Sequence, residues 1–271
     1  MESSIKHHDD SNKAQGGAAG QASGATLDLS EVEKFTAMAK AWWDPRGKFR
    51  PLHQINPIRL EYIVDEACVH FKRDPNAGEP LKGLRILDVG CGGGLVCEPL
   101  CRLGAQVTGI DAAAANIPIA QIHSQDSNLD IEYLNATVET LAAQGRSFDL
   151  VLALEVIEHV KAPPAFITAL RQVMRDDGLM ILSTLNKTAK SFALGIVAAE
   201  YILGWLPRGT HDWGRFVTPR QMEQWGEECG GLFMTKNRGL SYNPIRSTWS
   251  LTHDLSVNYL ATFKGQESAQ R

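Results

Sequence analysis

A short apolar run that ends in a glycine-rich segment most constrains the fold of this chain. The run at 85–89 is followed directly by the segment GCGGG at 90–94, and residues 95–103 then have the composition of a helix. Glycines at a strand-to-helix turn let the main chain approach a ligand that a Cβ atom would hold away. The segment therefore predicts a ligand-binding loop at the carboxyl end of a buried strand.

Downstream of this loop, apolar runs alternate with helical windows, which favours parallel strands joined by helices. Strands are expected at 85–89, 106–111, 131–135, 148–154 and 179–185. Helices are expected at 95–103, 115–124, 138–144, 163–175 and 219–229. Two last runs, 232–237 and 258–263, are expected to pair antiparallel at the sheet edge. We predict an α/β fold with a doubly wound, mostly parallel, seven-stranded Rossmann-like sheet.

The composition along the chain predicts its domain organisation. The expected parts are a disordered tail at 1–28, a helical cap at 29–82, a main domain at 83–264 that carries an insertion at 187–215, and a C-terminal tail at 265–271. The tail is rich in Gly, Ala, Ser and His and lacks periodicity. The cap should hold a helix from Asp28 or Ser30 towards Trp43, a turn-rich stretch at 46–57 and a second helix at 58–73.

The overall composition indicates an ordinary globular protein of a reducing compartment. With 44% hydrophobic and 21% charged residues, the chain can bury a sizeable core. A net charge of −4 gives no basic footprint for nucleic acid. The five cysteines follow no disulfide or zinc spacing, and the first residues lack the apolar stretch of a secretory signal. We expect a cytoplasmic protein that does not bind nucleic acid.

The glycine pattern favours one cofactor class over another. A dinucleotide fingerprint, G-x-G-x-x-G, would need glycine where Leu95 stands. The pattern present, Gly90, Gly92 and Gly94, is typical of S-adenosylmethionine binding. Asp111 ends the second expected strand about 20 residues further on, where a carboxylate can accept hydrogen bonds from both ribose hydroxyls. The alternative for Asp111 is a cap on the next helix. Asp88 either helps to position the glycine loop or the methionine end of the ligand, or has a purely structural role.

Ionisable residues follow the fourth expected strand. Ligands of open α/β sheets bind beyond the carboxyl ends of the strands. If the chain becomes helical there, Glu155, Glu158 and His159 share one face at i, i+3 and i+4. Such a face is a candidate metal site or general base for methyl transfer to a hydroxyl. Structural acids and a simple hydrogen-bonded histidine are the alternative, since Mg²⁺ prefers oxygen to imidazole.

The chain resembles the ubiquinone-biosynthesis O-methyltransferase family over residues 30–264. The matching segments are WWD at 42–44, PLHQINPIRL at 51–60, LDVGCGGG at 87–94, VTGID at 107–111, EVIEHV at 155–160, STLN at 183–186, GTHDW at 209–213 and YNP at 242–244. The N-P-x-R and G-T-H-D elements are far narrower than the glycine loop, which many methyltransferases share. A departure is the run of alanines at 112–115, where an acidic or serine-containing turn is more usual.

The resemblance implies an S-adenosylmethionine-dependent methyltransferase fold and an O-methyltransferase activity. The expected acceptors are polyprenylated catechol and 3-demethylubiquinol hydroxyls, and a multi-enzyme ubiquinone-biosynthesis complex is an expected partner. The implied cofactor contacts are Arg59, Gly90, Asp111 and Leu154, to which the glycine pattern adds Gly92. The family also implies a Mg²⁺ site at Glu155, Glu158 and His159. In this interpretation Glu155 and His159 are the catalytic residues.

The insertion at 187–215 contains a strongly apolar stretch. Residues 191–206 carry one charge, Glu200, and are shorter than the ~20 residues that span a bilayer. The apolar face is expected to hold Phe192, Ile196, Ala199, Leu203 and Leu206, with basic flanks at Lys187, Lys190, Arg208 and Arg215. We expect a lid that also contacts the cytoplasmic face of the inner membrane peripherally. A helix buried against the core is the alternative.

Other functions stay open from the residues alone. Within enzymes, the nearest rival is a methyltransferase for another small phenol or a quinone carbon. An NAD-dependent oxidoreductase is disfavoured by Leu95, and a non-catalytic cofactor-binding adaptor is disfavoured by the acids Glu155 and Glu158.

Overall fold

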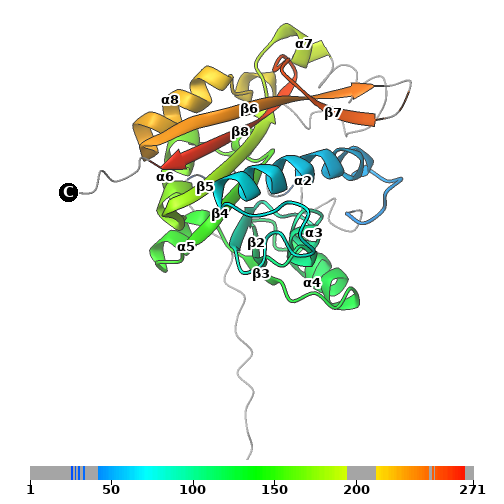
Figure 1. Ribbon diagram of the computed structural model, residues 1–271. Helices are drawn as coiled ribbons and strands as arrows, with labels where there is room; N and C mark the ends of the chain where they lie inside the picture. Colours follow the sequence, from blue (N-terminus) through cyan, green and yellow to red (C-terminus); the bar gives the residue numbers. More distant parts are fainter. Residues whose placement is uncertain are drawn as a thin grey trace, which may run out of the picture.

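The computed structural model describes residues 42–193, 212–243 and 248–265, together with Thr26, Asp28, Ser30, Glu33 and Arg246. Within these residues a single sheet forms the centre of the molecule (Figure 1). Its strands are β1 (Arg85–Val89), β2 (Gln106–Asp111), β3 (Glu132–Asn135), β4 (Phe148–Leu154), β5 (Met174–Leu185), β6 (Leu232–Asn243), β7 (Thr248–Thr252) and β8 (Asn258–Gly265). The order across the sheet is β3-β2-β1-β4-β5-β8-β6-β7.

The strand pairings confirm the predicted fold class. The pairs β2–β3, β1–β2, β1–β4 and β4–β5 are parallel, whereas β8 pairs antiparallel with both β5 and β6. The expected antiparallel pairing of the last two runs is therefore present. An eighth strand, β7, was not predicted and pairs antiparallel with β6. Its sequence, TWSLT, is too short and too polar to read as a buried run.

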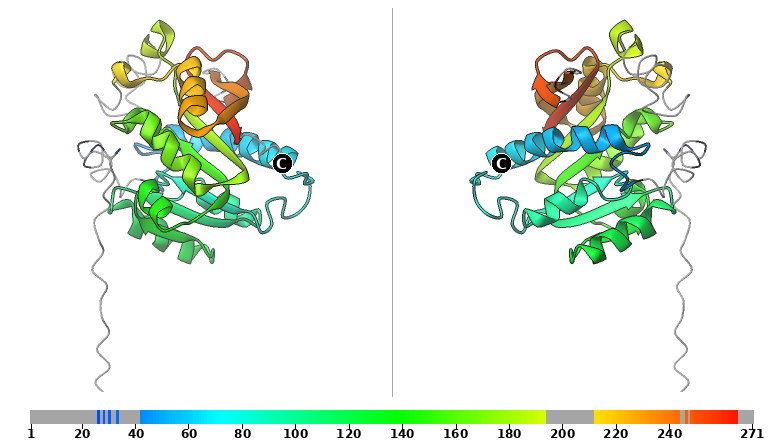
Figure 2. Two further views of the ribbon diagram at one scale, coloured as in Figure 1. Left: turned by 90° about the vertical axis from the view of Figure 1, so that its left-hand side faces the viewer. Right: turned by 90° about the vertical axis from the view of Figure 1, so that its right-hand side faces the viewer.

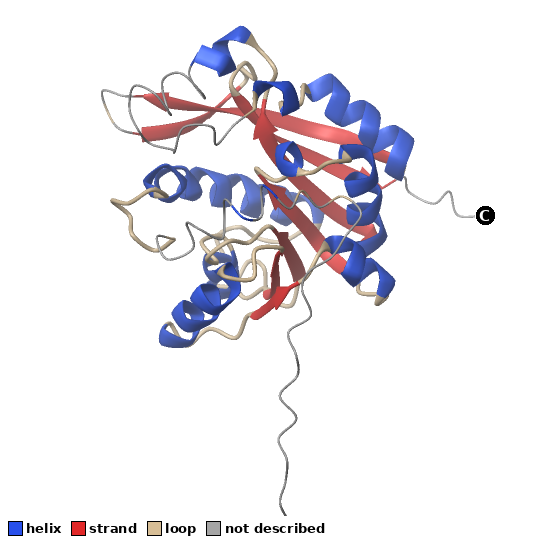
Figure 3. Ribbon diagram, turned by 180° about the vertical axis from the view of Figure 1, so that it is seen from behind, coloured by secondary structure: helices blue, strands red, loops and turns tan. Residues whose placement is uncertain are grey.

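Helices cover both faces of the sheet (Figures 1, 2 and 3). They are α2 (Arg50–His70), α3 (Cys97–Arg102), α4 (Asn116–Asp126), α5 (Val138–Ala143), α6 (Pro163–Val173), α7 (Ala189–Ser191) and α8 (Pro219–Gly230). Successive strand residues alternate between two cores, as the pleat requires. Leu150 and Leu152 pack in the core under α2, α3 and α4, and Val151 and Ala153 pack in the core under α5, α6 and α8.

The second cap helix begins earlier than expected. The predicted turn-rich stretch ends at Phe49, and α2 is helical from Arg50 onward, with Pro51 in its first turn and Pro57 inside it. Proline suits a first turn because its missing N–H has no partner there in any case. Pro57 costs one helical hydrogen bond, but Ile55 and Ile63 on either side are buried in the core. Tertiary packing thus keeps the helix continuous through the proline.

The end of the predicted disordered tail is attached to the body of the protein. Thr26 and Asp28 are buried. Thr26 donates its main-chain N–H to Glu139 Oε1 at 3.3 Å and accepts from the Lys161 N–H at 2.9 Å. Asp28 Oδ2 lies 2.9 Å from Arg215 Nη1. Most of the predicted first cap helix, and residues 194–211 of the insertion, lie outside the described residues. Among the described helices, none is long and apolar enough to cross a membrane.

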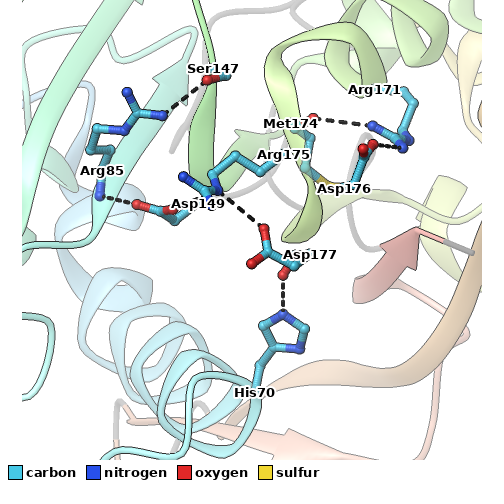
Figure 4. A network of polar contacts seen from close by, with 9 residues as sticks. All are labelled: His70, Arg85, Ser147, Asp149, Arg171, Met174, Arg175, Asp176 and Asp177. Carbon is cyan, nitrogen blue, oxygen red and sulfur yellow. Dashed lines mark hydrogen bonds and ion pairs between the residues drawn. The ribbon is translucent and has the colours of Figure 1, made fainter. Parts of the chain in front are cut away.

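A polar network joins the amino ends of the central strands, on the edge opposite their carboxyl ends (Figure 4). Asp149 at the start of β4 accepts the Arg85 N–H of β1 at 2.8 Å and lies 3.3 Å from Arg175 Nε of β5. Arg175 Nε also contacts the exposed carboxylate of Asp177 at 3.1 Å. The main-chain oxygen of Asp177 bonds His70 Nε2 of α2 at 2.8 Å. Asp149 of β4 therefore links its strand to both neighbours, through the Arg85 main chain of β1 and the Arg175 side chain of β5.

We expect Asp149→Ala to lower the free energy of unfolding by about 1–3 kcal/mol, because a main-chain N–H loses its charged acceptor. Asp177→Ala is the matched control. It removes the other carboxylate on Arg175, but that carboxylate is 77% exposed, and exposed ion pairs contribute about 0–1 kcal/mol. Urea unfolding of both variants gives the comparison, and equal losses would contradict the role assigned to Asp149.

Candidate functional site

The predicted ligand loop lies at the carboxyl ends of β1, β2 and β4. Gly90, Gly92 and Gly94 have φ values of +74°, +54° and +89°. Residues that carry a side chain rarely adopt this left-handed region of main-chain conformation, so all three positions favour glycine. The alternating glycines of the sequence thus reflect three positions in the loop at which the main chain is left-handed.

Neighbouring side chains also approach the loop too closely for a Cβ atom. A Cβ on Gly90 would lie 2.6 Å from Val156 Cγ2, and one on Gly92 would lie 2.3 Å from Trp42 Cζ2. Trp43 Nε1 donates to the Gly93 oxygen at 2.8 Å. The segment before α2 and the segment after β4 therefore pack directly on the glycine loop.

Asp111 joins the end of β2 to the same loop. Its Oδ2 accepts the Gly92 N–H at 2.9 Å, and its Oδ1 accepts the Ala113 N–H at 2.7 Å. Burial raises the pKa of this carboxyl, while hydrogen bonds from Ala113, Gly92 and the Asn116 side chain lower it. The helix α4 begins at Asn116 and has no side-chain cap. Asp111 therefore does not cap that helix, which was the alternative interpretation of this residue.

Asp88 lies beneath the loop and contacts α3. It is 3% exposed, and its Oδ2 accepts from Cys97 Sγ at 3.2 Å. The pKa of Asp88 is raised from 3.8 to about 7. Burial is the main cause and the charge of Asp111 adds to it, whereas the hydrogen bond from Cys97 acts in the opposite direction. Its contact with Cys97 of α3 favours the loop-positioning role over direct ligand binding.

The raised pKa of Asp88 predicts a pH-dependent stability. An unfolded aspartate titrates near 3.9, so between about pH 4 and pH 7 the folded protein holds a proton that the unfolded chain has lost. The free energy of unfolding should therefore fall as the pH rises through this window. Asp88→Asn keeps an acceptor for Cys97 but cannot titrate. The total fall in the free energy of unfolding across this window should therefore be smaller in the variant by a few kcal/mol.

Urea unfolding at pH 5, 6, 7 and 8 measures this slope. The matched control is Asp176→Asn, at a side chain that is 84% exposed, and it should retain the slope of the parent protein. An unchanged slope in Asp88→Asn would contradict the assignment.

Arg59 brings α2 into contact with the ends of β4 and β5. The guanidinium is almost fully buried, and its Nη2 donates to Glu155 Oε1 at 2.8 Å. Ser183 Oγ donates to the same carboxylate oxygen at 2.8 Å. Among the described residues, Arg59 Nε has no hydrogen-bond partner. The buried cation therefore has unused donor capacity at the strand ends.

The prediction that Glu155, Glu158 and His159 share one face of a helix is wrong. Glu155 has φ +56° and its N–H bonds the Ser183 oxygen at 3.0 Å, so the ladder between β4 and β5 continues through it. Only a short 3₁₀ turn, Ile157–His159, follows. A helix cannot begin at a residue whose main chain is still paired with a strand.

Glu158 points into the protein. It is 3% exposed, its Oε2 accepts from Thr184 Oγ1 at 2.9 Å, and its Oε1 has no partner among the described residues. Burial raises the pKa of Glu158 to about 7, with the nearby charge of Glu155 as a further cause. His159 is half-buried at the end of the short turn.

These residues do not fit a metal site in this arrangement. The Glu155 carboxylate is bound by Arg59 and Ser183. No group of three His, Cys, Asp or Glu side chains in the described part of the chain is placed to hold an ion. The Mg²⁺ site stays a prediction from the sequence.

Leu154 is the last residue of β4 and is half-buried. It pairs with Ser183 of β5, and Ala153 before it pairs with Val89 of β1. Leu154 is therefore beside the first glycine of the loop, and its contact with the cofactor stays a prediction. Ser183 and Thr184 were not among the predicted site residues. Two hydroxyl side chains at the carboxyl end of the otherwise apolar run 179–185 were the available signal.

Comparison with known proteins gives one family. A family model described as a methyltransferase domain matches residues 62–230. The ubiquinone biosynthesis O-methyltransferase of Cereibacter sphaeroides is 52% identical over 239 residues, 88% of this chain and 96% of that protein. The protein of the same name from Dinoroseobacter shibae is 51% identical over 236 residues, 87% of this chain and 95% of that protein.

Solved structures share the fold at low sequence identity. The plantazolicin methyltransferase BpumL in complex with SAH has a TM-score of 0.61 at 16% identity, covering 88% of this chain and 98% of that one. Magnesium protoporphyrin IX methyltransferase from Synechocystis, with bound SAH, has a TM-score of 0.58 at 18% identity, covering 88% and 94%.

Proposed function

The chain belongs to the ubiquinone biosynthesis O-methyltransferase family, and from that membership we propose that it methylates an aromatic hydroxyl of polyprenylated catechol and 3-demethylubiquinol acceptors, with S-adenosylmethionine as the donor. The observation that supports this most strongly is the contact of Asp111 with Gly92 at adjoining strand ends. Both residues lie at the carboxyl edge of the sheet, where a carboxylate can accept hydrogen bonds from ribose hydroxyls.

We assign the cofactor contacts on the same edge of the sheet. The backbone of Gly90 and Gly92 would lie against the donor, with Asp111 accepting from its ribose hydroxyls. Leu154 would supply apolar contact near the adenine. Arg59 would bind the methionine carboxylate, for which a guanidinium offers a planar pair of donors. Since Arg59 already holds Glu155 at 2.8 Å, the two carboxylates would share or exchange this cation.

Methyl transfer needs an acceptor oxygen in line with the sulfonium carbon. The oxygen forms a bond to the methyl carbon, the carbon–sulfur bond breaks, and the electron pair of that bond remains on sulfur. The hydroxyl proton must leave, and His159 is our candidate base because it follows the strand end beside the loop. Glu155 would orient the site through Arg59 and Ser183. The acids and His159 therefore have roles that do not require a metal.

Two variants should separate cofactor binding from chemistry. Asp111→Ala should raise the KM for S-adenosylmethionine about 10- to 100-fold, because charged hydrogen bonds contribute about 1.5–3 kcal/mol. His159→Asn should lower kcat by about 10²-fold or more and leave this KM near the parent value. The measurement is a methyl-transfer assay with short-tailed catechol and quinol acceptors, read by product mass.

Asp126→Ala, an exposed acid on α4, serves as the control and should match the parent. Methylation at a ring carbon, or of neither acceptor, would contradict the proposed function. An unaltered KM in Asp111→Ala would contradict the ribose assignment alone.

We also propose peripheral contact with a membrane at the two ends of the insertion. Phe192 and Trp213 are 46% and 40% exposed, and their ring centroids lie 6.4 Å apart. Lys187 Nζ lies 5.2 Å from the Trp213 ring, and Lys190 is nearby in the sequence. Aromatic side chains flanked by lysines suit the headgroup region of a bilayer. A lipid-tailed acceptor would be found in that phase. The predicted cytoplasmic location and assembly with other pathway enzymes stay predictions.

Replacing both exposed rings should weaken this contact. Phe192→Glu with Trp213→Glu should reduce co-sedimentation with anionic phospholipid vesicles, because charge replaces apolar surface in the interface. Val69→Glu is the matched control, since Val69 on α2 is 76% exposed and lies outside the insertion. Equal sedimentation of the double variant and the parent would contradict the proposal.

A further inference from the structure

We propose that Trp42 and Asn116 are cofactor-positioning residues, in which Trp42 orients the Asn116 side-chain amide and that amide orients the Asp111 carboxylate. Nothing in the sequence pattern assigned a role to Asn116. The inference rests on the proposed function of Asp111 as the acceptor for the cofactor ribose.

The three residues come from separate parts of the chain. Trp42 precedes α2, Asn116 is the first residue of α4, and Asp111 ends β2. Trp42 Nε1 donates to Asn116 Oδ1 at 2.8 Å in a fully buried contact. The Asn116 side-chain amide also lies close enough to the Asp111 carboxylate to lower its pKa. Asn116 is 1% exposed, so these partners replace water for its amide.

The indole decides which way the amide faces. An asparagine amide has one accepting end and one donating end, and the two orientations are nearly alike in shape. The indole N–H is a donor only. It therefore requires the oxygen of Asn116 on its own side, which leaves the NH₂ group to donate towards Asp111. Without that donor, the amide could turn its oxygen towards a carboxylate, and the two acceptors would repel each other.

The indole itself is firmly placed. Its ring stacks on Phe49 at a centroid distance of 3.9 Å and an interplanar angle of 4°. The Trp42 main-chain oxygen is 2.8 Å from His53 Nε2. On its other side the ring lies against Gly92 and Gly93, where any Cβ would collide with it. Trp42 thus transmits the position of the segment before α2 to the glycine loop and to Asn116 together.

The consequence concerns ground-state binding of the donor. Asp111 already accepts main-chain bonds on both oxygens, and the Asn116 donor restrains its remaining rotation. A carboxylate that is held in place need not reorganise when ribose hydroxyls arrive. Loss of either positioning residue should weaken the affinity for S-adenosylmethionine, while kcat at a saturating concentration of S-adenosylmethionine stays near the parent value.

A double-mutant cycle tests this arrangement by calorimetric titration with S-adenosylhomocysteine. Trp42→Phe, which keeps the ring on Phe49 but removes the N–H, should raise the Kd about three- to tenfold. Asn116→Ala should raise it about 10- to 100-fold, because the lost donor served a charge. The double variant should bind no more weakly than Asn116→Ala alone, since Trp42 acts through the amide.

Trp43→Phe is the matched control. It also removes one indole N–H, which bonds the Gly93 oxygen at 2.8 Å and not Asn116. Its effect on Kd should be the same factor whether Asn116 is present or replaced. Thermal melts without ligand show that each variant is folded before titration. A ligand that lacks the ribose 2′-hydroxyl should show a smaller loss for Asn116→Ala than S-adenosylhomocysteine does.

An unchanged Kd in Trp42→Phe, or additive effects of Trp42→Phe and Asn116→Ala, would overturn the proposal. Asp111→Ala separates this failure from failure of the proposed function. If Asp111→Ala weakens binding and the cycle shows no coupling, only the positioning roles are wrong. If Asp111→Ala also leaves binding unchanged, the ribose assignment itself is wrong.

Discussion

The hydrogen bond from the Gly92 N–H to the half-buried Asp111 carboxylate is the constraint on which the rest of the site depends. It joins the loop after β1 to the last residue of β2, so the carboxyl ends of two neighbouring parallel strands are linked. Burial raises the pKa of this acid, and the main-chain donors Ala113 and Gly92 lower it. The left-handed main chain at Gly92 brings one loop N–H to the acid, and the Ala113 N–H after β2 supplies the second main-chain donor.

A second buried charge organises the adjoining strand ends. Arg59 from α2 meets Glu155 at the end of β4, and Ser183 of β5 adds its hydroxyl to the same oxygen. Removing Glu155 would leave the buried Arg59 guanidinium without its counter-charge. In this arrangement the carboxylate that the sequence suggests for a metal balances the arginine that the sequence suggests for the cofactor. The two expected sites are therefore linked through one ion pair and are not independent.

Much of the fold was predictable because strand and helix periodicities differ along the main domain. The runs that became β1, β2 and β4 were predicted with the bounds that the structure has. Three features were not predictable from local pattern. The helix α2 continues through Pro57 because distant core contacts stabilise it, β7 is defined only by pairing with β6, and Glu155 stays in the sheet ladder because of Ser183. The role of Asn116 likewise depends on Trp42, a residue that is far from it in sequence.

The anchoring of Thr26 and Asp28 has a consequence for how the chain matures during translation. Thr26 bonds Glu139, which lies 113 residues further along the chain, and Asp28 pairs with Arg215 beyond the insertion. Asp28 thus cannot reach its final contact until the chain has been synthesised as far as Arg215. Because domains generally fold as units during synthesis, this N-terminal attachment should be a late step, completed only once the insertion has emerged as far as Arg215.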